Sequence, residues 1–368
     1  MHVTCATLFV AFTFCYLYFY QCDLIAASQH ILSGGQTHYD RLIGGCIVTL
    51  ALFCVHLAFL AVSRLTYRAY ALTFYPSLLI LLIMTVVQIP DSAHCNYGVW
   101  VWLVPLLFVV VIAIAYLVRK YESIEKAKRP VGFFSRIFWS NLMLLVLGFF
   151  LVGAFSNHDD VFHYRMRMES KLLKHDYAGA LEVGKKSLAA DSSLTLLRVH
   201  ALAKRRELGE RLFEYPLVGG SKALKPNGGS VQTIMYPTYN FTQLPKADYI
   251  LCGYLLDREI DAFAAAVGRF YASDSLLPRH YREALVLYNH ARLNPVVSYR
   301  HDVLDADYAD FQKLMRQIPD AQERHARLRD VYGNTYWYYY FDTNTKRPAE
   351  RQTSKVAEAG LEHATSRL

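Results

Sequence analysis

The sequence predicts an all-α protein, in which a bundle of five transmembrane helices precedes a water-soluble domain of helical hairpins. Two observations carry this prediction. From Met1 to Phe155 the chain consists of apolar runs with few charges, whereas charged residues recur every few positions from Ser156 onward. In the second part, apolar residues recur at helical spacing. We therefore expect a transmembrane domain at 1–155, an extracytoplasmic helical domain at 156–342 and a disordered tail at 343–368.

Five apolar stretches are each long enough to cross a bilayer, which requires about 20 residues for about 30 Å of hydrocarbon. The first stretch lacks the basic segment and the small-residue cleavage site of a signal peptide, so we expect it to be a retained helix. The predicted spans are 3–20, 42–62, 69–89, 99–118 and 137–155.

The charges in the connections between the spans predict the orientation of the chain. Basic residues gather between spans two and three and between spans four and five, and acidic residues lie in the other two connections. The basic residues are Arg64, Arg68, Arg119, Lys120, Lys126, Lys128, Arg129 and Arg136, and the acidic ones are Asp23, Asp40 and Asp91. We expect a protein of the bacterial inner membrane, with a cytoplasmic N-terminus and a periplasmic C-terminal domain.

Composition argues against several classes of function. The net charge is +8 and the sequence pI is about 9.0, but much of the basic excess flanks the spans, so the expected contact is the lipid bilayer and not nucleic acid. The seven cysteines include no CxxC pair, so we expect no cofactor and no structural zinc site.

Three polar residues lie inside predicted spans, where polar groups are costly and are therefore functional candidates. They are His56, Gln88 and Asn141. Each is alone in its span, and no Asp, Glu, Lys or Arg lies at the middle of a span. This pattern favours hydrogen bonding between helices over ion or proton transport.

The predicted outer loop Ser28–Asp40 contains His30, His38 and Asp40, which are candidate metal ligands by residue type. Such spacing in a loop is common by chance. We therefore predict no metal site and no catalytic residue, and keep these three residues as the candidates to examine.

The segment Lys174–Asp191 carries the clearest helical pattern of the second domain. Its helical face combines apolar with small residues, which allow a neighbouring helix to come close. The face comprises Tyr177, Ala180, Leu181, Gly184, Ser187 and Leu188. This pattern is typical of the second helix of a tetratricopeptide (TPR) repeat, with an unrelated helical bundle as the alternative. Further helical stretches are Ala247–Tyr271 and Pro278–Leu293.

Two other segments depart from this pattern. Phe213–Pro245 is rich in Gly and Pro and lacks a helical period, which is typical of functional or mobile loops. Thr335–Phe341 is almost entirely aromatic. It could seal the end of the helical domain, rest at the membrane interface or stack on sugars, and we favour the first role.

Four stretches together resemble a known family. They are Gln29–Tyr39 (QHILSGGQTHY), Leu212–Pro216 (LFEYP), Leu277–Leu285 (LPRHYREAL) and Thr335–Tyr339 (TYWYY). The family consists of uncharacterised multi-pass bacterial inner-membrane proteins with a TPR-like C-terminal half and a domain-of-unknown-function label. No catalytic residues are carried over to this chain from the resemblance.

The last residues, Val356–Leu368, resemble a peptide read from the antisense strand of a tRNA gene. We therefore interpret the tail as a read-through of the reading frame.

Two hypotheses for function follow. The first is a membrane-anchored module whose TPR-like domain binds a protein partner at the outer face of the inner membrane, without enzymatic activity. The alternative is a membrane enzyme or carrier for a lipid or glycan, which would use His30, His38, Asp40 and His94.

Overall fold

A computed structural model gives the fold of residues 1–65, 69–89, 94–122, 135–224, 233–237, 241, 246–271 and 277–341. Contacts within the chain divide it into two compact units, and the second begins at Asp160. Within the described ranges the secondary structure is helical, apart from one isolated antiparallel bridge between Gln88 and Asn96. The predicted all-α class is therefore confirmed for this part of the chain.

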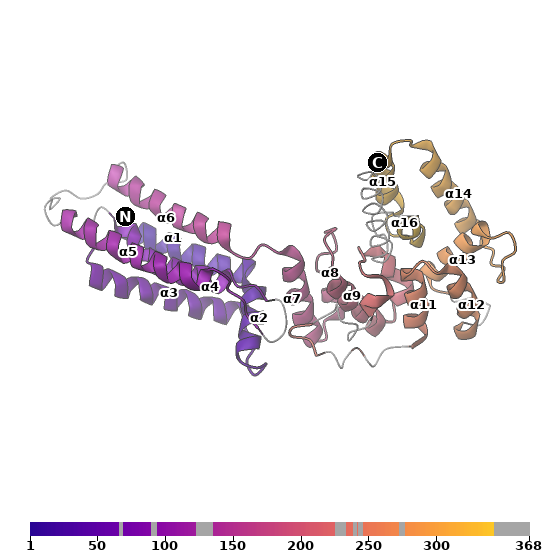
Figure 1. Cartoon of the computed structure of the whole chain (residues 1–368), viewed down its shortest axis with the longest axis horizontal. Coiled ribbons are helices and arrows are strands. Elements are labelled where there is room, and N and C mark those ends of the chain that lie inside the picture. Colours follow the sequence, from indigo (N-terminus) through magenta and orange to yellow (C-terminus); the bar gives the residue numbers. More distant parts are fainter. Residues whose placement is uncertain are drawn as a thin grey trace, which may run out of the picture. The chain divides into compact units, whose positions relative to one another are not determined.

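The first unit contains eight helical segments in the described ranges, and Figure 1 shows their arrangement. They are α1 (His2–Cys15), the π-helical turn η1 (Tyr16–Tyr20), α2 (Cys22–Leu32), α3 (Arg41–Ser63), the 3-10 segment η2 (Tyr70–Phe74) with its continuation α4 (Tyr75–Thr85), α5 (Trp100–Glu122) and α6 (Arg136–Phe155).

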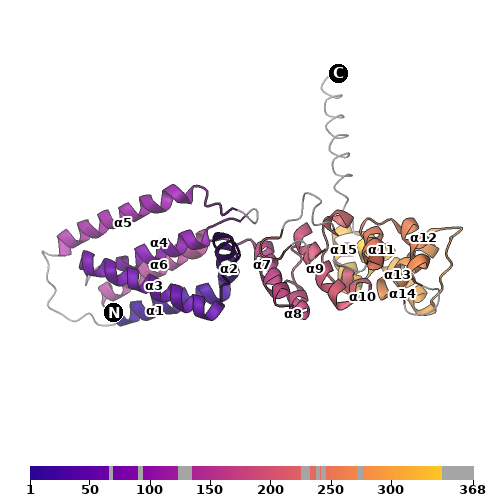
Figure 2. The ribbon, with the colours of Figure 1, turned by 90° about the horizontal axis from the view of Figure 1, so that it is seen from below.

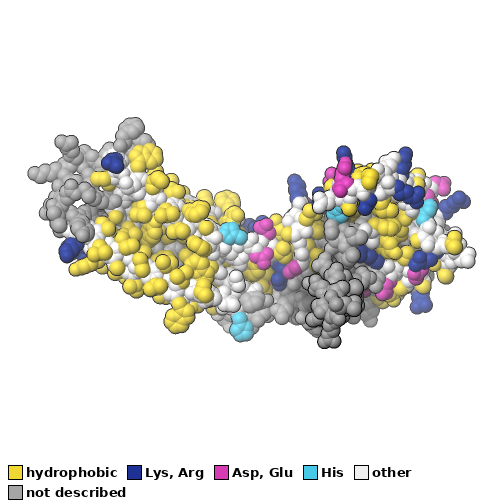
Figure 3. Space-filling view, turned by 45° about the horizontal axis from the view of Figure 1, so that its top comes forward, with side chains coloured by type: hydrophobic (Ala, Val, Ile, Leu, Met, Phe, Trp, Pro, Cys, Tyr) yellow, Lys and Arg dark blue, Asp and Glu magenta, His cyan; other side chains and the backbone are white. Residues whose placement is uncertain are grey.

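Four helices of this unit are long and apolar enough to cross a membrane, among the residues searched. They are His2–Tyr20, Arg41–Ser63, Trp100–Lys120 and Arg136–Phe155. Hydrophobic side chains cover the visible face of this unit, whereas charged side chains are spread over the second unit (Figure 3). Side chains such as Leu50, Trp102 and Phe150 are exposed, which is unfavourable in water and expected in contact with lipid tails.

The third predicted span, 69–89, is shorter than expected. Its helix runs from Tyr70 to Thr85 and begins with a 3-10 turn. Figure 2 shows this segment among its neighbours, and it packs against α3, α5 and α6. All but a few of its side chains are buried. Because it is surrounded by protein, its ends do not have to match the thickness of the hydrocarbon.

The second unit consists of short helices that follow one another along the chain. They are α7 (Asp160–Leu173), α8 (Tyr177–Glu182), α9 (Ser192–Arg205), α10 (Leu208–Arg211), η3 (Leu212–Glu214), η4 (Gly220–Leu224), α11 (Lys246–Leu256), α12 (Ile260–Phe270), α13 (Arg279–Ala291), α14 (Asp302–Gln317), α15 (Ala321–Tyr332) and α16 (Tyr336–Phe341). Successive helices pack on each other, and α9, which contacts α7, α8, α10, η3 and η4, is buried from Ser193 to Ala203.

Several predicted boundaries were wrong. The helix expected through Leu188 ends at Glu182, because Gly184 has a φ of +62° and the Tyr164 ring packs against its α-carbon. The stretch Ala247–Tyr271, predicted to be helical, contains two helices that are separated by a turn at Arg258. The loop expected from residue 28 begins after α2, at residue 33.

Three helix pairs are joined by the same turn, a repeat that the sequence reading missed. In each, a residue with a left-handed backbone follows the first helix, an acidic residue follows it, and an apolar residue begins the second helix. The left-handed residues are His175 (φ 57°), Arg206 (φ 60°) and Arg258 (φ 61°). The acidic residue always donates its N–H to a carbonyl five residues earlier: Asp176 to Lys171, Glu207 to Leu202 and Glu259 to Tyr254, at 2.8–2.9 Å. This is a Schellman turn without the usual glycine.

We expect glycine substitution to have opposite effects at two of these turns. A non-glycine residue in the left-handed region costs about 1 kcal/mol, and the His175 side chain is exposed, so His175→Gly should stabilise the domain by about that amount. Arg258→Gly should destabilise it, because the guanidinium donates to the Tyr339 carbonyl (2.9 Å) and lies over the Tyr339 ring. The urea midpoint of the full-length protein, measured by pulse proteolysis, tests both; an equal shift at both turns would contradict the argument.

Some predictions fall outside the described residues. They concern the tail 343–368, the basic residues Lys126, Lys128 and Arg129, and Arg68 and Asp91 in the other connections.

Candidate functional site

The candidate metal ligands His30, His38 and Asp40 do not form a three-ligand site. The rings of His30 and His38 lie 6.5 Å apart between centroids. The Asp40 carboxylate caps α3, accepting hydrogen bonds from the N–H groups of Leu42 and Ile43 at 2.9 Å. Within the described ranges, no group of three His, Cys, Asp or Glu side chains could hold a metal ion. The segment from His30 to Asp40 therefore forms a helix end, a turn and a helix cap.

Two of the three polar residues in the spans contact the buried segment η2. The ring of His56 lies 3.7 Å from that of Phe74, and its nitrogens lie 3.1 Å from the Thr73 hydroxyl and 3.4 Å from the Tyr70 hydroxyl. Asn141 accepts a hydrogen bond from the N–H of Ala71 at 2.8 Å. These contacts join α3 and α6 to η2, whereas the Gln88 side chain is exposed.

Three of the sequence motifs meet in the second unit. Glu283, from Leu277–Leu285, accepts hydrogen bonds from the backbone N–H of Tyr336 (2.7 Å) and from the Arg279 guanidinium (2.8 Å). Its backbone carbonyl accepts the Trp337 indole N–H at 2.7 Å. The Phe213 ring, from Leu212–Pro216, packs on the rings of His280, Tyr336 and Tyr339 at centroid distances of 4.8–5.0 Å. The motifs thus join η3, α13 and α16.

The hydrogen bonds in this cluster assign the tautomer of His280 and explain the pKa of Glu283. Nε2 of His280 accepts the N–H of Phe213 at 3.3 Å, so the proton of the neutral ring is on Nδ1, which donates to Glu283 at 2.9 Å. Burial raises the pKa of Glu283, but the His280 hydrogen bond, with the Tyr336 N–H and Arg279, outweighs it and leaves the pKa below its usual value. Because both side chains are buried, the geometry fits a structural junction and not a catalytic dyad open to substrate.

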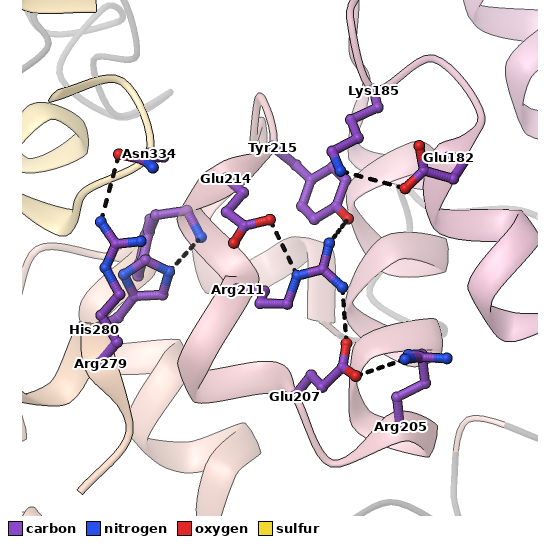
Figure 4. A network of polar contacts seen from close by, with 11 residues as sticks. Glu182, Lys185, Arg205, Glu207, Arg211, Glu214, Tyr215, Arg279, His280 and Asn334 are labelled. Atoms are coloured by element: carbon purple, nitrogen blue, oxygen red, sulfur yellow. Dashed lines mark hydrogen bonds and ion pairs between the residues drawn. The ribbon is translucent and has the colours of Figure 1, made fainter. Parts of the chain in front are cut away.

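A surface network extends this junction (Figure 4). Arg211 lies between Glu207 (2.9 Å) and Glu214 (3.1 Å) and donates to the Tyr215 hydroxyl at 3.2 Å. Glu207 also pairs with Arg205 at 2.7 Å. The network fixes the short segment after α10 to the end of α9.

Much of the described part of the Gly- and Pro-rich segment 213–245 is packed into the core, although Val218 is exposed. Ile234, Met235, Tyr236 and Phe241 are buried. The Glu169 carboxylate, on α7, accepts the N–H groups of residues 234, 235 and 236 through one oxygen. Burial raises the pKa of Glu169 more than these hydrogen bonds lower it. This segment covers side chains of α9, where the Tyr236 hydroxyl lies 2.9 Å from His200.

The aliphatic side chains that are most exposed in the described part of the second unit lie on one connection. Between α13 and α14 the chain projects beyond the helices (Figure 1), and it carries Leu293, which is 101% exposed, and Val296, which is 83% exposed. Val303 follows in the first turn of α14 and is 65% exposed. We call these three residues the aliphatic tip. Close to it in sequence, Arg292 forms an ion pair with Asp261 (2.6 Å), and the His290 ring lies within hydrogen-bond distance of Asp305 (2.9 Å).

Comparison with known proteins gives a family match for part of the second unit. Residues 240–343 match the model of a family of unknown function, DUF6057. The match runs from before α11 to beyond α16, so it includes the aliphatic tip and the motifs around Glu283 and Trp337. No curated protein and no solved structure matches the chain. The predicted resemblance to an uncharacterised family is thus confirmed for this stretch, and the match does not extend to the apolar helices of the first unit.

Sequence reasoning missed both the aliphatic tip and the buried Glu169. Leu293 and Val296 flank the pair Asn294-Pro295 and follow a helix, which is a weak signal for a turn but none for exposure. Glu169 lies between Met168 and Leu172 on the buried face of α7, so a carboxylate at an apolar position was a signal available in the sequence.

Proposed function

We propose that this chain is a multi-pass protein of the bacterial inner membrane whose TPR-like helical domain lies at the outer face and binds a protein partner through the aliphatic tip. The proposal combines a membrane anchor, a domain of repeated hairpins and one exposed apolar surface.

The membrane helices support the anchor. Four helices meet the length and composition of spans, and the shorter apolar segment 70–85 packs among them. If that segment also crosses, the chain has five crossings, and its two ends lie on opposite sides. Arg119 and Lys120 lie in the last turn of α5, and Arg136 is the first residue of α6. These two helix ends are joined by one connection, so the basic residues favour its side of the membrane as cytoplasmic.

The three shared turns support the repeat. A TPR unit is a pair of antiparallel helices with a short turn, and stacked units bury each other's faces. The pairs α7–α8, α9–α10 and α11–α12 have one turn geometry, and α9 is buried between neighbouring helices and the segment after it.

The exposure of the aliphatic tip is the observation that carries partner binding. Burying a Leu or Val side chain is worth about 1.5–3 kcal/mol, and a contiguous exposed apolar patch rimmed by polar residues is typical of an interaction site. The expected partner is a protein with an apolar surface, whose rim pairs with the charged groups at Asp261, Arg292 and Asp305.

A photo-crosslinking amino acid at Leu293 in living cells tests this. We expect one reproducible protein adduct, and replacement of both Val296 and Val303 by serine should reduce its yield roughly tenfold. The control carries the same crosslinker at Leu188, a residue outside the tip that is 67% exposed. Adducts with lipid alone, or the same protein captured equally from position 188, would contradict the proposal.

A further inference from the structure

One hollow in the first unit has the composition of a ligand site. Its volume is about 600 Å³, which falls in the range of small-molecule pockets. It lies between the chain that leaves α4, the chain that enters α5 and the end of α6. The lining includes Gln88, Asn96, Tyr97, Trp100, Phe155 and His158.

Hydrogen bonds hold the backbone around this hollow in place. Gln88 and Asn96 exchange two backbone hydrogen bonds of 2.8 Å, which close the connection between α4 and α5. On the other side, the N–H of Asn157 donates to the Thr85 carbonyl at 2.8 Å, and its side chain donates to the Val87 carbonyl at 3.2 Å. The walls are therefore built by three separate segments tied to one another.

The hollow lies at the boundary between the apolar and polar parts of the unit. It includes the first residue of α5 and the last residue of α6, Trp100 and Phe155, whose rings lie 5.3 Å apart. The basic residues of these helices are at their opposite ends. Val99 lines the hollow and is 74% exposed, and Trp102 beyond it is 82% exposed. A molecule in the hollow can therefore keep an acyl chain against lipid-facing side chains.

The polar side chains of the lining point to a neutral ligand with many hydroxyl groups. Among the described residues that line the hollow there is no Lys or Arg and there is one acid, Asp159, so a phosphate would lack the cations that usually bind it. The side-chain amide of Gln88 is exposed, and that of Asn96 keeps its NH₂ group while its oxygen accepts the Gly98 N–H at 2.8 Å. Amides donate to and accept from hydroxyls, and the lining also contains the aromatic residues Tyr97 and Trp100, whose apolar rings can pack against a sugar ring.

We propose that this hollow binds a neutral sugar, either as the headgroup of a glycolipid or as a free saccharide. The site would be separate from the aliphatic tip and does not depend on partner binding there.

Lipid capture by the full-length protein tests the proposal. The protein is placed in nanodiscs that contain equal amounts of a monogalactosyl diacylglycerol, phosphatidylethanolamine and phosphatidylglycerol, and the lipids retained after transfer to detergent are measured by native mass spectrometry. We expect the galactolipid to be enriched, and Gln88→Leu to lower its affinity roughly tenfold through the lost hydrogen bonds. Gln36→Leu is the matched control, because Gln36 is also exposed but lies in the connection between α2 and α3, outside the hollow.

Competition with free galactose identifies the source of the sugar. Displacement of the galactolipid by millimolar galactose would indicate that a free saccharide also fits, and retention would indicate a lipid-linked sugar. No preference for the galactolipid over the two phospholipids would overturn the proposal. So would equal binding by the wild type and Gln88→Leu, or an equal loss in Gln36→Leu, provided that all three proteins have the same thermal midpoint.

Discussion

Glu283→Ala is expected to destabilise the helical domain by about 3–5 kcal/mol, the usual effect of removing one partner from a buried polar cluster. The carboxylate is 1% exposed, and one of its oxygens accepts both the His280 Nδ1–H and the Tyr336 N–H. Alanine leaves both donors buried without an acceptor, and it also leaves a cavity beside α16. The loss should detach α16 from α13 before the rest of the domain unfolds.

Trp337 provides the measurement. It is one of four tryptophans, and the other three, Trp100, Trp102 and Trp139, lie in the long apolar helices α5 and α6 of the first unit, so they can be replaced by phenylalanine. The fluorescence of Trp337 should then shift to longer wavelength at a much lower urea concentration in Glu283→Ala than in the parent.

Two variants bracket the effect at Glu283. Glu283→Gln keeps a carbonyl oxygen for His280 and Tyr336 and loses only the bond to Arg279, which is 34% exposed, so it should cost about 1 kcal/mol. Glu182→Ala removes a surface carboxylate paired with Lys185 and should change stability by less than about 1 kcal/mol. An alanine variant as stable as Glu283→Gln would show that α16 does not depend on this carboxylate.

The pH dependence of this cluster has a definite sign. The pKa of Glu283 is lowered in the folded state, so the unfolded chain binds more protons at acid pH. The contribution of Glu283 is therefore complete above the unfolded carboxyl pKa of about 4.3 and is lost as the pH falls through the lower folded value. Glu283→Gln should remove that part of the acid sensitivity.

The first unit was easier to predict than the second, for a physical reason. A candidate span such as Arg136–Phe155 is recognised by one dominant cost, the transfer of polar backbone into hydrocarbon, so length and composition are sufficient. The segment 70–85 departed from the expected length because its surroundings are protein and not lipid. Burial of that kind depends on neighbours that are distant in sequence.

In the helical half, the decisive contacts join residues far apart in the chain. Leu212–Pro216, Leu277–Leu285 and Thr335–Tyr339 could be selected as motifs, but not placed together, because the contacts of Phe213 with His280 and Tyr336 have no local signal. The shared turn, in contrast, did leave a local signal in the sequence. His175-Asp-Tyr, Arg206-Glu-Leu and Arg258-Glu-Ile have the same order of basic, acidic and apolar residues, although at unequal spacing, which hides the repeat from a search for a fixed period.

Glu169→Leu is expected to have the second large effect, and a local one. Leucine removes the acceptor of the N–H groups of residues 234–236, and each buried donor left without a partner costs about 1–3 kcal/mol. The chain can avoid most of this cost if residues 233–237 leave α9 and bind water instead. We therefore expect rapid proteolysis within this segment at a urea concentration where the domain is otherwise folded.

Cys252 distinguishes local release from global unfolding. It is fully buried on α11, and burial raises the pKa of its thiol to about 12, so maleimide should label it only when the domain opens. In Glu169→Leu, cleavage near residue 235 should precede labelling of Cys252, as followed by peptide mass spectrometry. Simultaneous cleavage and labelling would show that the segment is inseparable from the core.

Glu169→Gln separates the acceptor from the charge. It keeps one oxygen for the three N–H groups, so the segment should stay bound to α9. Because the pKa of Glu169 is raised in the folded state, the folded protein binds the proton more tightly, and stability falls as the pH rises from the usual carboxyl pKa through the raised value. Glu169→Gln has no such titration, so its stability relative to the wild type should increase over that pH interval. If the difference in stability between the two proteins is independent of pH, folding does not change the free energy of ionising Glu169. Arg165, whose charge lowers the pKa of Glu169, would then be the residue to replace.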